Sequence, residues 1–340
     1  MIDILKYFIL LLAKYSGLFR FFRSKYRKRM RILCYHGFSL KNEEKFVPGL
    51  FIKPEIFEAR MKYLRDNHYN VISLEEAFIS AKSGTIADDS VVITIDDGFY
   101  SVYSSALPIL KKYDLPSTLY LTSYYFDRDC PIFTLAVNYM FWNSDIADFD
   151  LDKLNIDGLK SVKAGTPELE QSKLKIIEIG QAFDNNDQRI ELLIKLGQIT
   201  GQDYNDLNKS RILNLINEAE LRKCIEGSMD IELHTHRHVF PTNPTQAALE
   251  IEKNKTRVNP LLEKPMTHFC YPSGEWAKEH WHVLDELDIK TSTTCENGLI
   301  TADTPVHAWS RFLDSARISQ LEYESELCGF TEFLRNLRGR

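Results

Sequence analysis

The sequence VVITIDDGF, at residues 91–99, is the clearest guide to how this chain folds. Its first five residues are β-branched without interruption, which is typical of a strand buried on both faces. Gly98 then allows the backbone to turn where the carboxylates of Asp96 and Asp97 emerge. Functional groups gather at the carboxyl ends of strands in α/β folds, so we expect a site at this point.

Further short apolar runs alternate with helical patterns, at 31–34, 70–73, 117–121, 229–233, 268–271, 290–294 and 308–312. This alternation predicts β/α units around a parallel sheet or barrel. A helix is expected after Pro54, where Phe57, Met61 and Leu64 share one face. A capping-box pattern at residues 73–76 predicts a second helix, and residues 320–337 a closing one.

The strand pattern stops between about residues 143 and 218. Polar sequence follows there, with helical runs at 171–183 and 187–197. We therefore expect a helical insertion inside one α/β domain that spans residues 31–340. Such a fold tolerates the 137 residues between Asp97 and His234, because each residue follows its own strand.

Positive charge is concentrated at the start of the chain. Residues 1–31 carry nine Lys or Arg and one Asp, a net charge of +8, whereas the remainder has 33 basic and 47 acidic residues. A general nucleic-acid-binding face is therefore not expected. The apolar run at 7–13 is far shorter than the ~20 residues that span a bilayer, and it lacks a signal-peptide cleavage site.

We expect residues 1–30 to form an amphipathic helix with a basic run, which lies in the plane of a membrane or packs on the domain. An uncleaved signal and a partner-binding helix are the alternatives. The six cysteines are scattered, with no C-x-x-C pair, and are interpreted as reduced thiols. These features favour a cytoplasmic protein, peripheral on the inner face of the cell membrane.

A histidine cluster, His234-Thr235-His236-Arg237-His238, follows the run at 229–233. One Asp and two His suffice for a catalytic divalent metal with a position left for water. Asp97 is the expected carboxylate ligand, and Asp96 could then act as general base. Spacing alone leaves open which histidines bind, because alternate residues of an extended strand share a face. A solvated turn and a polar strand exit are the structural alternatives.

These motifs resemble those of the polysaccharide deacetylase family, the carbohydrate esterases with a NodB homology domain. Thr-Ile-Asp-Asp-Gly at 94–98 is similar to the first motif, His-Thr-His-Arg-His at 234–238 to the second, and Phe-Cys-Tyr-Pro-Ser-Gly at 269–274 to the third. The resemblance covers about residues 31–335 and implies a distorted (β/α) barrel of about seven strands. It implies zinc on Asp97, His234 and His238, Asp96 as base, and a structural role for His236.

Two departures from the family pattern matter. Cys270 occupies the place of an arginine that orients the catalytic Asp, and Arg311, in Trp-Ser-Arg-Phe at 309–312, looks like its substitute. The C-terminal Leu-x-x-His motif is absent, so resemblance to the poly-N-acetylglucosamine deacetylase branch implies His36 as the acid, with His307 as its rival. Ser273 would donate its backbone N–H to an oxyanion. Tyr271 and Trp276 are expected to wall the groove.

The resemblance implies a metal-dependent hydrolase that removes N-acetyl groups from an amino sugar. Its substrate would be a polysaccharide or a lipid-linked surface-glycan intermediate. A hydrolase of a non-sugar amide or imide is the alternative within the enzyme class. A non-catalytic glycan-binding protein is the alternative outside it.

Overall fold

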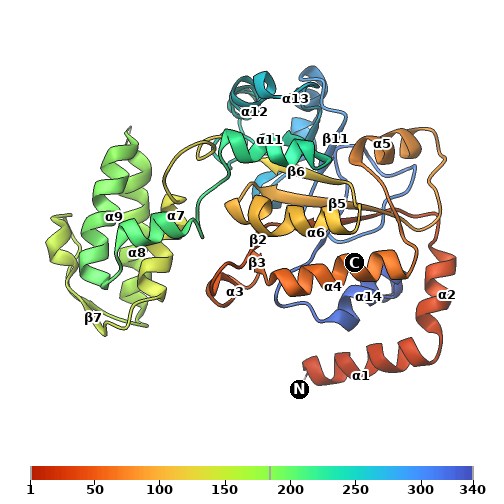
Figure 1. Cartoon of the computed structure of the whole chain (residues 1–340), viewed down its shortest axis with the longest axis horizontal. Coiled ribbons are helices and arrows are strands. Elements are labelled where there is room, and N and C mark those ends of the chain that lie inside the picture. Colours follow the sequence, from red (N-terminus) through yellow and green to blue (C-terminus); the bar gives the residue numbers. More distant parts are fainter. Residues whose placement is uncertain (1, 184, 339–340) are drawn as a thin grey trace. The chain divides into compact units, whose positions relative to one another are not determined.

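The computed structural model describes residues 2–183 and 185–338, and the chain divides into two compact units (Figure 1). The barrel unit comprises Met1–Phe126 and Ile216–Arg340, and the inserted unit comprises Asp127–Leu215. Each unit has its own set of secondary-structure elements and its own core.

The barrel unit is built on a curled parallel sheet. Seven strands follow the order β11-β10-β9-β6-β5-β1-β12, and β4 pairs with the start of β5. Their bounds are β1 Arg31–Tyr35, β4 Asn70–Val71, β5 Ser90–Asp97, β6 Ser117–Leu121, β9 Met229–Leu233, β10 His268–Cys270, β11 Thr291–Thr293 and β12 Phe312–Leu313. This arrangement confirms the expected distorted barrel of about seven strands.

The last strand differs from its sequence prediction. Residues 308–312 were expected to be extended, but β12 comprises only Phe312–Leu313, and Trp309 contributes a single parallel bridge to Thr293. Trp309 is fully buried among Ile32, Tyr120 and Cys270 inside the curled sheet. Backbone hydrogen bonds also join this segment to β11, from Trp309 N–H to the Ser292 carbonyl at 3.0 Å and from Thr294 N–H to the Trp309 carbonyl at 2.9 Å. Burial of one large side chain and a short run of strand-like hydrogen bonds therefore hold this edge together.

The other helices of this unit are α3 Glu43–Phe46, in the connection between β2 (Gly37–Phe38) and β3 (Phe51–Ile52), α4 Pro54–Asp66, α5 Leu74–Lys82, α6 Leu107–Lys112, α11 Glu218–Glu226, α12 Pro244–Val258, α13 Trp281–Glu286, α14 Gln320–Cys328 and α15 Phe330–Leu337. The predicted helix after Pro54 is confirmed, with Phe57, Met61 and Leu64 all buried. The capping box at Ser73 is also confirmed. A short two-stranded sheet joins β2 Gly37–Phe38 to β3 Phe51–Ile52.

The prediction of one closing helix over 320–337 is wrong. Gly329 has a φ of 81°, a left-handed conformation that ends α14 and starts α15. A Cβ on this glycine would lie 2.6 Å from the ring of Tyr26. The break lets α15 fold back beside the N-terminal helices, and Phe330 and Phe333 both pack against Phe22.

Two helices begin the chain, α1 Ile2–Tyr15 and α2 Leu18–Lys25. Gly17, with a φ of 85°, makes the turn between them. They pack on α14 and α15 through a cluster of their own, which includes Leu10, Ala13, Phe19 and Phe22. Among the described residues, no helix is long and apolar enough to cross a membrane.

The inserted unit is mainly helical, with α7 Phe133–Trp142, α8 Pro167–Ala182, α9 Asn186–Thr200 and α10 Tyr204–Ser210. A small antiparallel pair, β7 Asp148–Phe149 and β8 Val162–Lys163, connects α7 to α8. The unit begins at Asp127, before the expected boundary near residue 143, because α7 packs with α8 and α9. The ring of Phe133 lies directly over Gly180, where any Cβ would collide with it.

Candidate active site

Two adjacent carboxylates end β5 inside the mouth of the barrel unit. Asp96 and Asp97 are only 2% and 7% exposed. Successive side chains of an ideal strand point to opposite faces, but Asp97 has a φ of 71° and Gly98 a φ of 94°, so the chain turns here. This turn brings both carboxylates to the same end of the sheet.

Asp97 lies between two histidines. Its Oδ1 is 3.3 Å from Nε2 of His234 and 3.3 Å from Nε2 of His238. The three side chains offer one ligand atom each within 4.8 Å of one another. Burial would raise the pKa of Asp97, but the neighbouring His238 and His234 lower it to about 2, so Asp97 is a carboxylate.

His234 is oriented by the atoms behind it. Its Nδ1 lies 2.9 Å from the carbonyl oxygen of Cys270, which can only accept, so Nδ1 carries the proton and, in the neutral ring that a metal ion requires, Nε2 presents a lone pair. The His234 backbone N–H donates to Asn254 Oδ1 at 3.0 Å. Within the described part of the chain, His234 Nε2 and Asp97 Oδ1 are buried without a hydrogen-bond partner. Facing orphan acceptors of this kind fit a divalent cation.

His236 lies outside this cluster. Its Nδ1 is 2.9 Å from the hydroxyl of Ser123, and its ring packs against Tyr124. Regular alternation would have placed it beside His234 and His238. However, Thr235 and His238 have φ values of 62° and 57°, so the segment is not extended.

Asp96 is held by a buried arginine. Arg311 Nη1 donates to Asp96 Oδ1 at 2.7 Å, and Nη2 donates to Oδ2 at 2.8 Å. Burial would raise the pKa of Asp96, but Arg311 holds it well below its usual range. Arg311 Nη1 also contacts Thr94 Oγ1, and its Nη2 lies 3.0 Å from Cys270 Sγ. Cys270 thus contacts the same arginine that holds Asp96.

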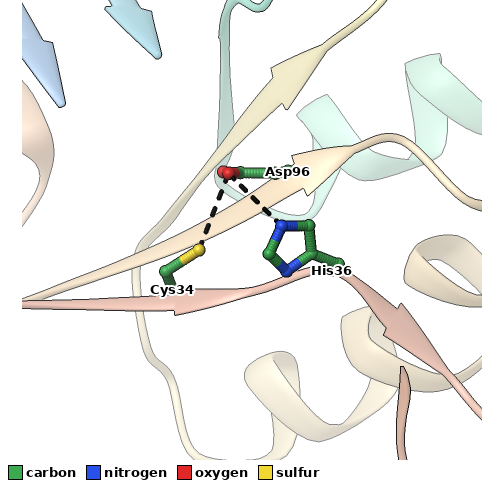
Figure 2. A group of neighbouring side chains, drawn as sticks. All are labelled: Cys34, His36 and Asp96. Atoms are coloured by element: carbon green, nitrogen blue, oxygen red, sulfur yellow. Dashed lines mark hydrogen bonds and ion pairs between the residues drawn. The ribbon is translucent and has the colours of Figure 1, made fainter. Parts of the chain in front are cut away.

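His36 reaches the same carboxylate from β1. In the β1–β5 register Cys34 pairs with Thr94 and Tyr35 with Ile95, so His36 follows opposite Asp96. Figure 2 shows Cys34 and His36 both directed at the Asp96 carboxyl group, as expected for side chains two residues apart. His36 Nε2 lies 3.7 Å from Asp96 Oδ2, and Cys34 Sγ lies 3.6 Å from it.

His307 is not brought to the site. Its Nδ1 is 3.0 Å from Ser292 Oγ, and its Nε2 is 2.9 Å from Asp285 Oδ1. Both ring nitrogens therefore have partners, and the ring is buried. His36 is the better placed of the two candidate acids.

Two other groups of side chains have the composition of a metal site, Cys34 with His36 and Asp96, and Asp96 with His234 and Cys270. Both include the carboxylate that already carries two hydrogen bonds from the Arg311 guanidinium. A cation placed there would face that fixed positive charge at close range, which is strongly unfavourable in a buried site. Among the residues that the structure describes, no arginine or lysine pairs with the Asp97, His234 and His238 group.

The residues of the third motif have different surroundings. Ser273 has a φ of 58° and lies between Pro272 and Gly274, and among the described residues its backbone N–H has no acceptor. The expectation that Tyr271 walls a groove is wrong, because it is fully buried and its hydroxyl donates to the His307 carbonyl. Trp276 is partly exposed and bonded to Glu296.

The sequence prediction missed the residues that support the site from behind. Asn254 lies on α12 and links the His234 backbone to the Leu121 carbonyl of β6, and no motif marks it. Cys34 has no place in the site predicted from the sequence, although its two-residue spacing from His36 could have placed it beside Asp96. Burial raises the pKa of its thiol, so Cys34 keeps its proton next to the carboxylate.

Comparison with known proteins gives consistent results. Residues 83–142 and 196–292 match the family model described as polysaccharide deacetylase. The chain is 28% identical over 159 residues to a Bacillus subtilis protein named "Putative polysaccharide deacetylase YxkH", covering 46% of this chain and 52% of that one. It is 31% identical over 77 residues to a Staphylococcus aureus poly-beta-1,6-N-acetyl-D-glucosamine N-deacetylase, covering 23% and 27%. The matches thus span about half or less of these relatives.

Solved structures share the fold. The Streptococcus pyogenes deacetylase PplD, in complex with acetate, superposes with a TM-score of 0.57 at 17% identity, covering 88% of this chain and 98% of that one. IcaB from Ammonifex degensii superposes with a TM-score of 0.55 at 14% identity, covering 88% and 97%. At these identities the likeness concerns the fold alone.

Proposed function

Because the chain belongs to the polysaccharide deacetylase family, we propose that it is a metal-dependent hydrolase that removes N-acetyl groups from an amino sugar. Residues 31–340 would form the deacetylase domain, interrupted by the inserted unit, and residues 1–30 a membrane-associating segment. We propose Asp97, His234 and His238 as the metal ligands and zinc as the ion. A bound divalent metal supplies a Lewis acid for the amide carbonyl and lowers the pKa of water to about 7.

Asp96 is the proposed general base. It is buried beside the metal ligands and ionised, since Arg311 occupies the plane of its carboxylate with two donated hydrogen bonds. Those bonds also fix its orientation, so the remaining lone pairs can accept a proton from the attacking water. Arg311 acts through Asp96 as a positioning residue.

His36 is the proposed acid, and Ser273 the proposed oxyanion donor. An amide nitrogen leaves only after it is protonated, and His36 stands next to Asp96 with a partly exposed ring. The Ser273 backbone N–H, free of an internal acceptor, would donate to the negative oxygen of the tetrahedral intermediate. The overall reaction converts one amide and one water into acetate and a free amine.

The proposed substrate is an N-acetylated amino sugar in a polysaccharide or a lipid-linked surface-glycan intermediate. Support comes from the relative named for poly-beta-1,6-N-acetyl-D-glucosamine. We place the enzyme in the cytoplasm at the inner face of the cell membrane, where the basic N-terminal segment would meet anionic lipid.

The observation on which the proposal rests is the pair of buried, partnerless acceptors on Asp97 and His234 beside an ionised Asp96. The test is acetate release by zinc-loaded protein from a panel of polymeric, oligomeric and lipid-linked N-acetylated sugars. Release from one class would identify both reaction and substrate. Metal-loaded protein that releases no acetate from any of them would favour a non-sugar amide or a binding role.

A further inference from the structure

The first helix of the chain exposes an apolar stripe. Leu5, Phe8, Ile9, Leu12 and Tyr15 follow the i, i+3, i+4, i+7 spacing of one helix face. All are well exposed, and Leu12 and Tyr15 reach 70% and 82%. Figure 1 shows α1 as the outermost element of its unit, with α14 on one side.

The opposite face of α1 carries its charges. Lys6 pairs with Glu322 and Lys14 with Glu324, both on α14, and Leu10 and Ala13 are buried between them. An ordinary surface helix turns its apolar stripe to the core and its charges to water. In α1 the ion pairs face the protein and the apolar stripe faces outward, so packing on the domain does not account for this stripe.

The second helix also exposes apolar side chains and adds positive charge. Leu18 and Phe21 are 41% and 59% exposed. Arg23 pairs with Asp89, and Arg27 and Lys28 pair with Asp88. In contrast, Arg20 and Lys25 are exposed and, among the described residues, have no carboxylate partner. The Lys25 ammonium does lie 5.4 Å from the centroid of the Tyr26 ring.

We propose that this outer face docks in the interface of a bilayer rich in anionic lipid. The outer face comprises the apolar side chains at 5, 8, 9, 12, 15, 18 and 21, together with Arg20 and Lys25. Its apolar atoms would enter the headgroup boundary, and its cations would meet lipid phosphates. A second copy of the chain is a poor occupant, because a symmetric pairing would bring the Arg20 and Lys25 cations of two copies to one interface.

Docking leaves the candidate active site accessible. α2 leads into the amino end of β1. Asp89, which pairs with Arg23 of α2, and Asp88, which pairs with Arg27 and Lys28 after it, precede β5. Asp96 and Asp97 lie at the other end of β5, about 26 Å away for eight strand residues. The membrane surface and the catalytic mouth therefore use opposite ends of the same strand.

The test is cosedimentation of the full chain with vesicles of equal parts phosphatidylglycerol and phosphatidylcholine, and with phosphatidylcholine alone. Wild-type protein is expected to bind the anionic vesicles more tightly, and less so at high salt. Leu12→Gln should weaken binding roughly tenfold. Leu174→Gln is the matched control, since Leu174 is 68% exposed on α8, and should bind as wild type.

Charge is tested in the same way. Arg20→Gln and Lys25→Gln should each weaken binding roughly fivefold, whereas Lys253→Gln, on exposed α12 surface, should not. The Asp96→Asn variant should bind vesicles as wild type, which separates this proposal from the deacetylase proposal. Absence of wild-type binding, or equal binding by Leu12→Gln, would overturn it. Self-association without lipid that Leu12→Gln abolishes would instead assign the face to a second copy.

Discussion

Arg311 donates two hydrogen bonds to Asp96, at 2.7 and 2.8 Å, although 215 residues separate them in the sequence. Both side chains are almost fully buried. A buried carboxylate without a cation would be protonated at neutral pH, and so could not accept a proton from water. The pair therefore keeps Asp96 ionised, as its proposed role of general base requires.

Replacing Arg311 with Met should raise the pKa of Asp96, because its burial would no longer be offset. The base is active only as a carboxylate, so the acidic limb of the kcat/KM profile should move to higher pH. Arg60→Met is the matched control, since Arg60 forms a similarly buried pair with Asp314. Both variants should lose about 3–5 kcal/mol of stability, but Arg60→Met should leave the limb in place. An unmoved limb in Arg311→Met would contradict the assignment.

His238→Gln should weaken zinc binding at least about 100-fold, measured by competition with a chelating dye. The imidazole Nε2 faces Asp97 and is one of three ligands. His236→Gln is the control from the same loop, because the His236 ring bonds to Ser123 instead. Equal loss of zinc in both variants would mean that the loop rearranges around the metal.

His36→Gln should lower kcat by about 10²–10⁴-fold, as loss of a general acid does. His307→Gln should reduce stability, because both nitrogens of His307 bond to Ser292 and Asp285, yet leave kcat near the wild-type value. Steady-state kinetics and thermal unfolding of both variants check this. The reverse ranking of kcat would make His307 the acid.

Gly98→Ala should destabilise the protein by about 1–3 kcal/mol. Gly98 has a φ of 94°, and a Cβ there would lie 2.3 Å from Leu121 Cδ1. Gly84→Ala is the control that separates backbone strain from steric collision. Gly84 also has a positive φ, of 68°, but no atom lies within 4 Å of its Cβ position. Chemical denaturation should show a larger loss of unfolding free energy in Gly98→Ala than in Gly84→Ala. Zinc binding should weaken in Gly98→Ala alone.

Much of the fold could be predicted from the sequence because its signals are local. The β-branched run before Asp96 is long enough to identify a buried strand, and the helix at Pro54 has a proline in its first turn and an apolar face within one segment. The glycine that ends α14 at residue 329 is also visible in the sequence. The contact of its backbone with the Tyr26 ring is not, because Tyr26 lies far away in the sequence.

Contacts between distant segments could not be predicted in the same way. Nothing near Asn254 indicates that its amide joins His234 to β6, since a helical Asn is usually solvated. Tyr271 was misplaced because an aromatic residue next to a motif is compatible with either a groove or a core. The outward apolar stripe of α1 depends on which face meets α14, and this is a property of the assembled unit.

The most direct measurement is zinc content and acetate release in Asp96→Asn, compared with wild type on the same acetylated substrate. The account predicts one zinc site filled as in wild type, because Asp97, His234 and His238 are unchanged, and turnover reduced by about 10²–10⁴-fold. Acetate release at the wild-type rate by the zinc-loaded variant would contradict Asp96 as the base. Loss of zinc from the variant would contradict the division of roles between the two carboxylates.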